Sequence, residues 1–63
     1  MDAIQNARHE KGLTIRQAAA QAGISKTHFH LIEKGERKPS GPLAIRLAEL
    51  LDLDFRDFYN HST

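Results

Sequence analysis

Three glycines divide the first half of this 63-residue chain at intervals of about one short helix. Gly12, Gly23 and Gly35 each follow a segment with helical character, and glycine is the residue that most readily takes the positive φ angle at which helices end. Thr14 and Ser25, both common N-cap residues, stand where the next segments begin. This punctuation predicts short helices joined by tight turns.

The same signals place further helices in the second half. Pro42 suits the first turn of a helix, and Asp54 is a candidate N-cap, as Asp2 is at the start of the chain. Period-two alternation is absent and β-branched residues are few, so no strand is predicted. We expect a compact all-α, five-helix domain over residues 1–63, with helices at 2–11, 14–21, 25–34, 42–51 and 54–60.

Length and composition exclude several classes of protein. A chain of 63 residues supports one modest core, and without cysteine it has no disulfide or thiolate chemistry. No apolar run approaches the ~18–20 residues of a membrane span, and no signal-peptide pattern is present. We expect a soluble, cytoplasmic protein with no membrane association and no small-molecule ligand bound to this chain; whether it is the N-terminal part of a longer protein stays open.

Hydrophobic spacing predicts which side chains face inward. The alanines at 18 and 19 are notable because two helices joined by a tight turn need close backbone approach. The predicted core contains Ile4, Ala7, Leu13, Ala18, Ala19, Ile24, Phe29, Ile32, Ala44, Leu47, Ala48, Leu51, Leu53, Phe55 and Phe58.

Charge is distributed unevenly along the chain. Residues 1–46 hold eight Lys and Arg against four Asp and Glu, a net of +4, whereas residues 47–63 hold one against four, a net of −3. This separation lets one face attract a polyanion although the whole chain carries only +1.

The segment from Thr14 to Lys34 has the form of a helix-turn-helix. Two helices of about eight residues flank Ala22-Gly23-Ile24, a connection short enough for a steep crossing. With Phe29 and Ile32 turned inward, the exposed start of the second helix presents hydrogen-bond donors, a hydroxyl and one apolar side chain, and no acid. The predicted base-contacting residues are Lys26, Thr27, His28, His30 and Leu31.

Basic and polar residues flank this surface on both sides. One group follows the second helix and the other begins the first, so both are positioned for phosphates beside a groove. The predicted phosphate-contacting residues are Thr14, Arg16, Gln17, Lys34, Arg37 and Lys38.

Between Ile4 and Phe58 the chain resembles the Cro/phage-repressor-type, or XRE-like, helix-turn-helix family. The resemblance rests on Arg8, Ala19 and the blocks Lys11-Gly12-Leu13-Thr14, Gly23-Ile24-Ser25, Ile32-Glu33-Lys34-Gly35 and Arg37-Lys38-Pro39-Ser40. It implies the lambda-repressor-like fold, with the segment from Ser25 as the recognition helix. It also implies that homodimers bind near-palindromic operators in double-stranded DNA, most often as repressors. It also implies a buried salt bridge between Arg8 and Glu33, so that Arg8 belongs to the scaffold.

The sequence departs from this family at two places. Ile15 stands where many members have a phosphate-binding glutamine, which shifts that contact to Arg16 or to backbone N–H groups at the helix start. Two histidines, His28 and His30, stand on the recognition helix, and we hypothesise that protonation strengthens DNA binding as the pH falls toward ~6.5.

Other functions were weighed against DNA binding. His9, His28, His30 and His61 form no i, i+4 pair, so neither a metal nor another cofactor is expected, and no carboxylate pair or phosphate loop indicates an enzyme. The helix at 42–51 is apolar over a wide arc, which predicts a dimer interface formed by Leu43, Leu50, Phe58 and Tyr59. The alternatives are that the tail covers Leu43 and Leu50, or that the surface of Leu43, Leu50 and Tyr59 makes the chain an antagonist or antitoxin that binds another regulator.

Overall fold

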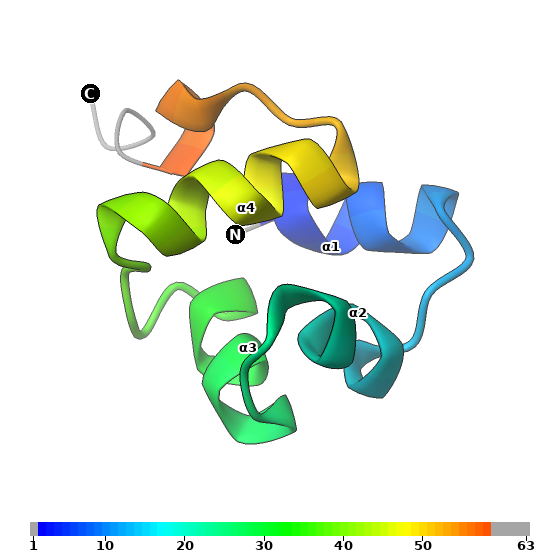
Figure 1. Ribbon diagram of the computed structural model, residues 1–63. Coiled ribbons are helices and arrows are strands. Elements are labelled where there is room, and N and C mark those ends of the chain that lie inside the picture. The colour runs from blue at the N-terminus through cyan, green and yellow to red at the C-terminus, as the bar shows by residue number, and fades with distance from the viewer. Residues whose placement is uncertain (1, 59–63) are drawn as a thin grey trace.

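The computed structural model describes residues 2–58, apart from the side chains of Asp2, Phe55 and Asp57. Four α-helices occur in the order α1 (Asp2–Glu10), α2 (Ile15–Ala22), α3 (Lys26–Glu33) and α4 (Gly41–Leu51), and the 3-10 helix η1 (Phe55–Phe58) follows (Figure 1). The described residues contain no strand. The prediction of an all-α helix-turn-helix domain is confirmed.

The fifth predicted helix is wrong in type. Its described part is one turn of 3-10 helix over four residues, and its predicted end at Asn60 lies outside the described residues. Four residues are too few for an α-helix to gain from cooperative hydrogen bonding, so the cap at Asp54 directs only a turn. The cap expected at Asp2 and the core position expected for Phe55 concern side chains that lie outside the described part of the structure.

Local capping explains where three of the helices begin. The Thr14 hydroxyl accepts a hydrogen bond from the Gln17 N–H at 3.1 Å, and the Gln17 amide oxygen accepts one from the Thr14 N–H at 3.0 Å. This reciprocal capping box satisfies two backbone donors at once. At α3 and α4 the cap is a single hydrogen bond: the hydroxyls of Ser25 and Ser40 accept from the N–H groups of His28 and Leu43.

The turn between α2 and α3 depends on glycine. Gly23 has φ 77° and ψ 27°, its N–H donates to the Ala20 carbonyl, and the Ile24 N–H donates to the Ala19 carbonyl. These bonds close α2 and reverse the chain within two residues. A β-carbon at Gly23 would also lie 3.4 Å from Nη1 of Arg46, which packs over the turn.

The core lies where α4 crosses the α2–α3 pair, with α1 and η1 closing its sides (Figure 1). Its largest fully buried side chains are Ile4, Phe29, Ile32, Leu47, Leu51 and Phe58. Ala22 is buried although the spacing argument omitted it, and Leu13, Ile24 and Leu53 are only partly buried against the core. Small residues on α2, including Ala18 and Ala19, let α3 and α4 approach closely.

Candidate nucleic-acid interface

A buried ion pair joins the first helix to the third. Arg8 Nε lies 2.7 Å from Glu33 Oε2, and Arg8 Nη2 donates to Glu33 Oε1 at 3.2 Å. Arg8 Nη1 donates to the Leu13 carbonyl at 2.9 Å, which fixes the chain just before α2. Both charged side chains are only 8% exposed. Arg8 therefore positions α2 and α3 relative to each other, the scaffold role that the family resemblance implied.

The two faces of α3 have different roles. Phe29, Ile32 and Glu33 are buried and hold the helix against the rest of the domain. The predicted base-contacting residues lie on the other side: Lys26, Thr27 and His30 are exposed, while His28 and Leu31 are partly buried. The structure thus brings these five side chains onto one helix and leaves three of them fully open to a partner.

Two helix N-termini open onto the same region of the surface. The caps occupy the N–H groups of Thr14 and Gln17 at α2 and of His28 at α3, whereas within the described part of the chain no hydrogen bond engages those of Ile15 and Arg16 or of Lys26 and Thr27. Neither helix has an acidic residue in its first turn. Free N–H groups and the positive end of the helix dipole together favour a bound anion.

Cations stand at these two helix starts and in the loop after α3. Among the side chains that the structure describes, four of the predicted DNA-contacting cations form no ion pair: Arg16, Lys26, Arg37 and Lys38. Arg16 and Lys26 line one open depression together with Arg8, Thr14 and Ile15. Lys34 differs from the four, because its ammonium lies 3.1 Å from the Glu36 carboxylate and is partly neutralised.

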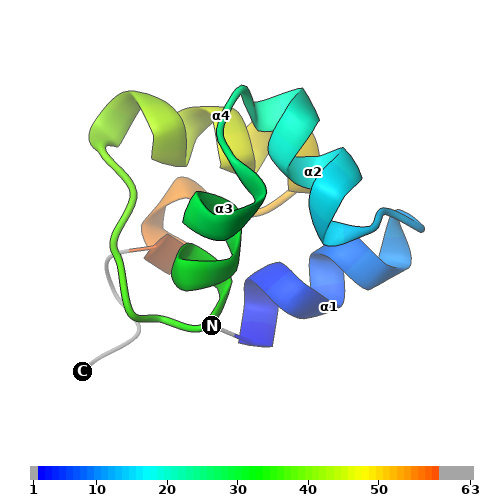
Figure 2. The same ribbon diagram turned by 90° about the horizontal axis from the view of Figure 1, so that it is seen from below.

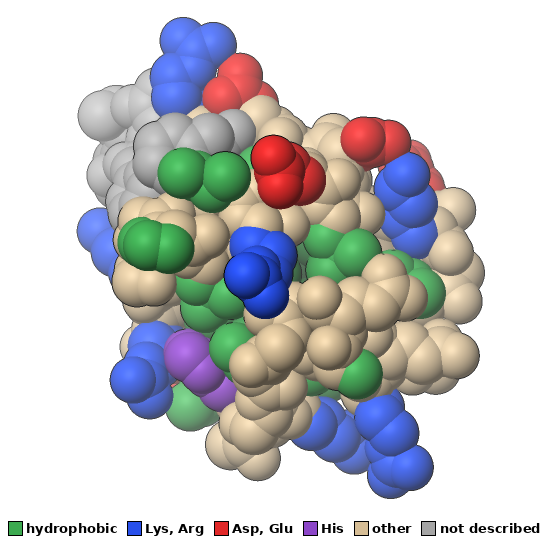
Figure 3. All heavy atoms as spheres, viewed as in Figure 1, with side chains coloured by type: hydrophobic (Ala, Val, Ile, Leu, Met, Phe, Trp, Pro, Cys, Tyr) green, Lys and Arg blue, Asp and Glu red, His purple; other side chains and the backbone are tan. Residues whose placement is uncertain are grey.

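Acidic side chains on the face seen in Figure 3 lie mainly toward the top, over α4 and the segment after it. Lys and Arg side chains are spread over this face, and several of them lie along its lower edge around α2 and α3. Figure 2 views the molecule from that lower side, with α3 in front, α2 beside it and the loop after α3 along the other flank. The predicted base and phosphate contacts therefore lie on neighbouring elements of one side.

The predicted dimer interface needs correction. Phe58 is 0% exposed and belongs to the core, because η1 folds back against α4. Leu43 and Leu50 are partly buried against the same core, and Tyr59 lies outside the described residues. The sequence argument missed Ile45, which is 51% exposed and is the one large hydrophobic side chain classed as exposed among the described residues. Its place on the wide apolar arc of α4 was the available signal.

Metal binding and membrane insertion find no support among the described residues. No group of three or more His, Cys, Asp or Glu side chains in this part of the chain is arranged to hold a metal ion. No helix within it is long and apolar enough to cross a membrane.

Comparisons with known proteins give the same assignment as the geometry. Residues 2–57 match the family described as "Helix-turn-helix domain". The chain is 36% identical over 52 residues to an uncharacterized HTH-type transcriptional regulator, YqaF, of Bacillus subtilis strain 168, covering 82% of this chain and 68% of that protein. A crystal structure of an HTH_3 family transcriptional regulator from Vibrio cholerae superposes with a TM-score of 0.73 at 28% identity, covering 97% of this chain. The chain spans 34% of the length of that regulator.

The fold and the surface define a small helix-turn-helix domain with a cationic, donor-rich recognition helix. The chain belongs to the helix-turn-helix domain family, of the XRE-like type, which is a family of DNA-binding transcriptional regulators and not of enzymes.

Proposed function

We propose that this chain is a sequence-specific regulator of transcription that binds double-stranded DNA as a homodimer, on a near-palindromic operator, and acts as a repressor in the cytoplasm of a bacterial or phage-infected cell. One observation carries the proposal: the N-termini of α2 and α3 keep N–H groups that bond to nothing within the described residues, and four cations at these helix starts and in the loop after α3 form no ion pair among the described side chains. A double helix is the partner that uses both features together, since it offers phosphates beside a groove of α-helical width.

Sequence would be read by the exposed side of α3. The side chains of Lys26, Thr27 and His30 are exposed and form no hydrogen bond or ion pair with the rest of the described residues, so their donors are available for base edges. The side chains of His28 and Leu31 are partly buried and would reach less far into the groove. His28 would contact a base edge there, and Leu31 a thymine methyl. The buried residues Phe29 and Ile32 set the angle at which the helix enters the groove.

Phosphates would be bound on both sides of α3. On one side we assign the Arg16 side chain and the free N–H groups of Ile15 and Arg16, which replace the glutamine absent at Ile15. Thr14 and Gln17 contribute mainly by capping, because their hydroxyl and amide oxygens accept hydrogen bonds from each other's backbone. On the other side lie Arg37 and Lys38, with a smaller contribution from Lys34 because of Glu36.

Dimeric binding follows from the small size of one reading surface. One helix of eight residues contacts only a few base pairs, and a two-fold pair of such helices doubles the site and makes it palindromic. The repressor assignment rests on the DNA-binding role alone: a bound dimer blocks access to the promoter that it covers. The relatives named above are transcriptional regulators, which supports this reading.

The test is a selection from random duplexes with the purified chain, followed by binding measurements on the selected site. We expect enrichment of a palindrome with half-sites about one helical turn, roughly 34 Å, apart. For variants that remove a cation near α3, such as Lys26→Ala, the matched control is Lys11→Met. It also lowers the net charge by one, but away from α3, at a residue paired with Asp52. Failure to enrich any sequence, with equal weak binding to all duplexes, would contradict the proposal.

A further inference from the structure

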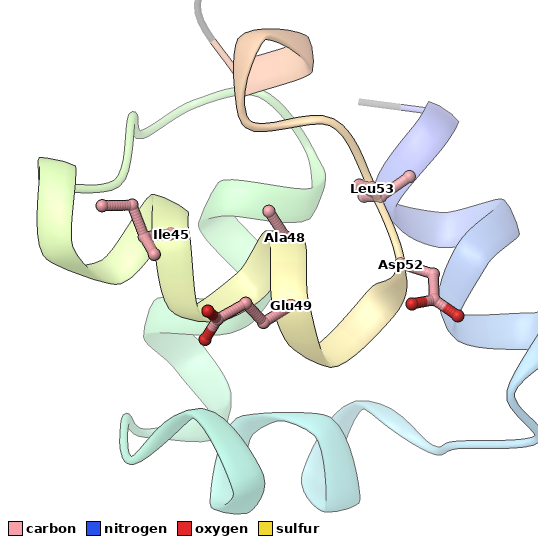
Figure 4. Close-up of a pocket in the computed structure, with 5 residues that line it drawn as sticks. All are labelled: Ile45, Ala48, Glu49, Asp52 and Leu53. Atoms are coloured by element: carbon pink, nitrogen blue, oxygen red, sulfur yellow. The ribbon is translucent and has the colours of Figure 1, made fainter.

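The exposed side of α4 carries features that DNA binding does not use. Ile45, Ala48, Glu49 and Asp52 recur at the i, i+3, i+4, i+7 spacing of one helix face, and with Leu53 they line an open depression (Figure 4). Ile45 is 51% exposed at one end of it. An apolar side chain held in water beside an unfilled hollow favours a protein partner at this site.

The charges beside the depression form a pattern that complements itself. Arg46 and Glu49 are exposed, are three residues or about 4.5 Å apart along the helix axis, and form no ion pair among the described side chains. The other carboxylate at the depression, Asp52, is already neutralised by Lys11 at 2.8 Å. A second copy with its α4 reversed would bring each Arg46 toward the Glu49 of the other.

The direction of α4 fits such a pairing. In Figures 1 and 4 this helix runs across the view, the α2–α3 pair lies below it, and in Figure 4 the depression faces the viewer. A two-fold axis running from α4 down toward the α2–α3 pair reverses the second α4. The same axis leaves both recognition helices pointing to one side, as binding to one face of a duplex requires.

We propose that the Ile45–Leu53 face of α4 is the surface on which a second copy of this chain docks, with the two α4 helices antiparallel. Ile45 of each copy enters the depression of the other near Ala48 and Leu53, and two reciprocal Arg46–Glu49 pairs flank the contact. This inference deepens the proposed homodimer and rests on it, and it replaces the Leu43, Leu50 and Phe58 surface expected from the sequence.

The contact is small, so the dimer is weak without DNA. One helix face buries less than the ~1,200 Å² of total area that a stable specific complex needs. Two half-sites on one duplex raise the effective concentration of the second copy and complete the assembly.

Sedimentation equilibrium of the full chain without DNA tests the surface directly, from about 10 µM to about 1 mM, where a weak interface populates both species. Arg46→Glu and Glu49→Arg each turn two attractive pairs into two repulsive ones. Each variant should raise the dimer dissociation constant about tenfold, since one exposed pair is worth a factor of a few. A 1:1 mixture of the two variants restores every attraction and should dimerise at least as well as the unmodified chain.

The matched controls are Arg37→Glu and Glu10→Arg, which carry the same net charges as the two test variants at exposed positions away from α4. Neither control, alone or mixed, should change the dissociation constant. Circular dichroism checks that all variants are folded. A chain that stays monomeric at about 1 mM, or a mixture that gains no more than the controls do, overturns the proposal.

Binding to a duplex with a single half-site separates this inference from the proposed function. Arg46→Glu should leave single-site affinity unchanged and reduce the cooperativity on a double site. If the chain binds a single site but the α4 variants leave cooperativity intact, the docking surface is wrong and DNA binding stands. If no duplex is bound while the charge-swap mixture restores dimers, the proposed function is wrong and the docking surface stands.

Discussion

The surface around α3 and the C-terminal end of α4 manage charge in opposite ways. Around α3, the cations Arg16, Lys26, Arg37 and Lys38 form no ion pair among the described side chains. The buried charges of Arg8 and Glu33, by contrast, are paired with each other beneath the surface. At the end of α4, Asp52 is exposed and paired. The difference teaches that a surface built to meet a polyanion leaves its positive charges uncompensated, while the scaffold beneath it does not.

The largest effect is expected from removing Arg8, because the buried carboxylate of Glu33 then loses the positive charge that faces it beneath the α3 surface. Arg8→Met should lower the free energy of unfolding by about 3–5 kcal/mol, the cost of leaving Glu33 buried without its partner. Thermal or urea unfolding measures the loss. The double variant Arg8→Met with Glu33→Leu should recover much of it, because an apolar pair of similar volume needs no neutralisation. A loss below about 1 kcal/mol for the single variant would mean that water reaches Glu33.

Removing the loop cations tests the uncompensated surface itself. Arg37→Ala with Lys38→Ala should weaken binding to all duplexes alike and reduce the slope of log affinity against log salt by about 1.8, or 0.9 for each lost phosphate contact. Titrations at several salt concentrations measure that slope. Lys34→Ala should change it less, since Glu36 already neutralises this lysine. Equal slopes for Lys34→Ala and Lys38→Ala would contradict the distinction.

Lys26 distinguishes base contacts from phosphate contacts on the α3 surface. As a base contact, Lys26→Ala should cost about 1–3 kcal/mol on the preferred operator and relax the preference at one base pair. Lys26 shares its depression with Arg16, however, so a phosphate role predicts a loss that is the same for every sequence. Selection from random duplexes with the variant chain distinguishes the two roles. A loss of affinity that is the same for every sequence would mean that Lys26 contacts a phosphate and not a base.

The smallest effect is expected where a charge is already paired and exposed. The hydrogen bond from Lys11, assisted by its charge, holds the pKa of Asp52 below its usual range. Because the folded-state pKa is lowered, the pair stabilises the domain above the usual carboxyl range, and this is lost as the pH falls through the folded-state value. Lys11→Met should return the pKa toward its usual range in an NMR titration. The small difference in unfolding midpoint at neutral pH should vanish in acid, and a difference that persists there would show that Lys11 acts through packing.

Much of the fold could be predicted from local chemistry. The caps at Thr14, Ser25 and Ser40 and the glycine at position 23 act within four residues, so their effects can be read along the chain. The Arg8–Glu33 pair spans 25 positions and came from the family resemblance, since spacing alone does not join such distant charges.

The failures have a common physical cause. The backward turn that buries Phe58 and the exposure of Ile45 depend on how segments pack in three dimensions. Helical periodicity places a residue on an apolar arc and says nothing about which part of that arc its own chain will cover. The N–H groups left open by the capping box at α2 were equally hidden, because they appear only once each hydrogen bond is assigned.

The division of α3 into a buried and an open side has a consequence for evolution. Phe29, Ile32 and Glu33 carry the attachment of the helix, while the exposed Lys26, Thr27 and His30 make no contribution to it. Changes at those three positions therefore cost the domain little stability, and drift there can rewrite the target sequence without a compensating change elsewhere. A gene duplication would give two regulators of different targets on one unchanged scaffold after very few substitutions.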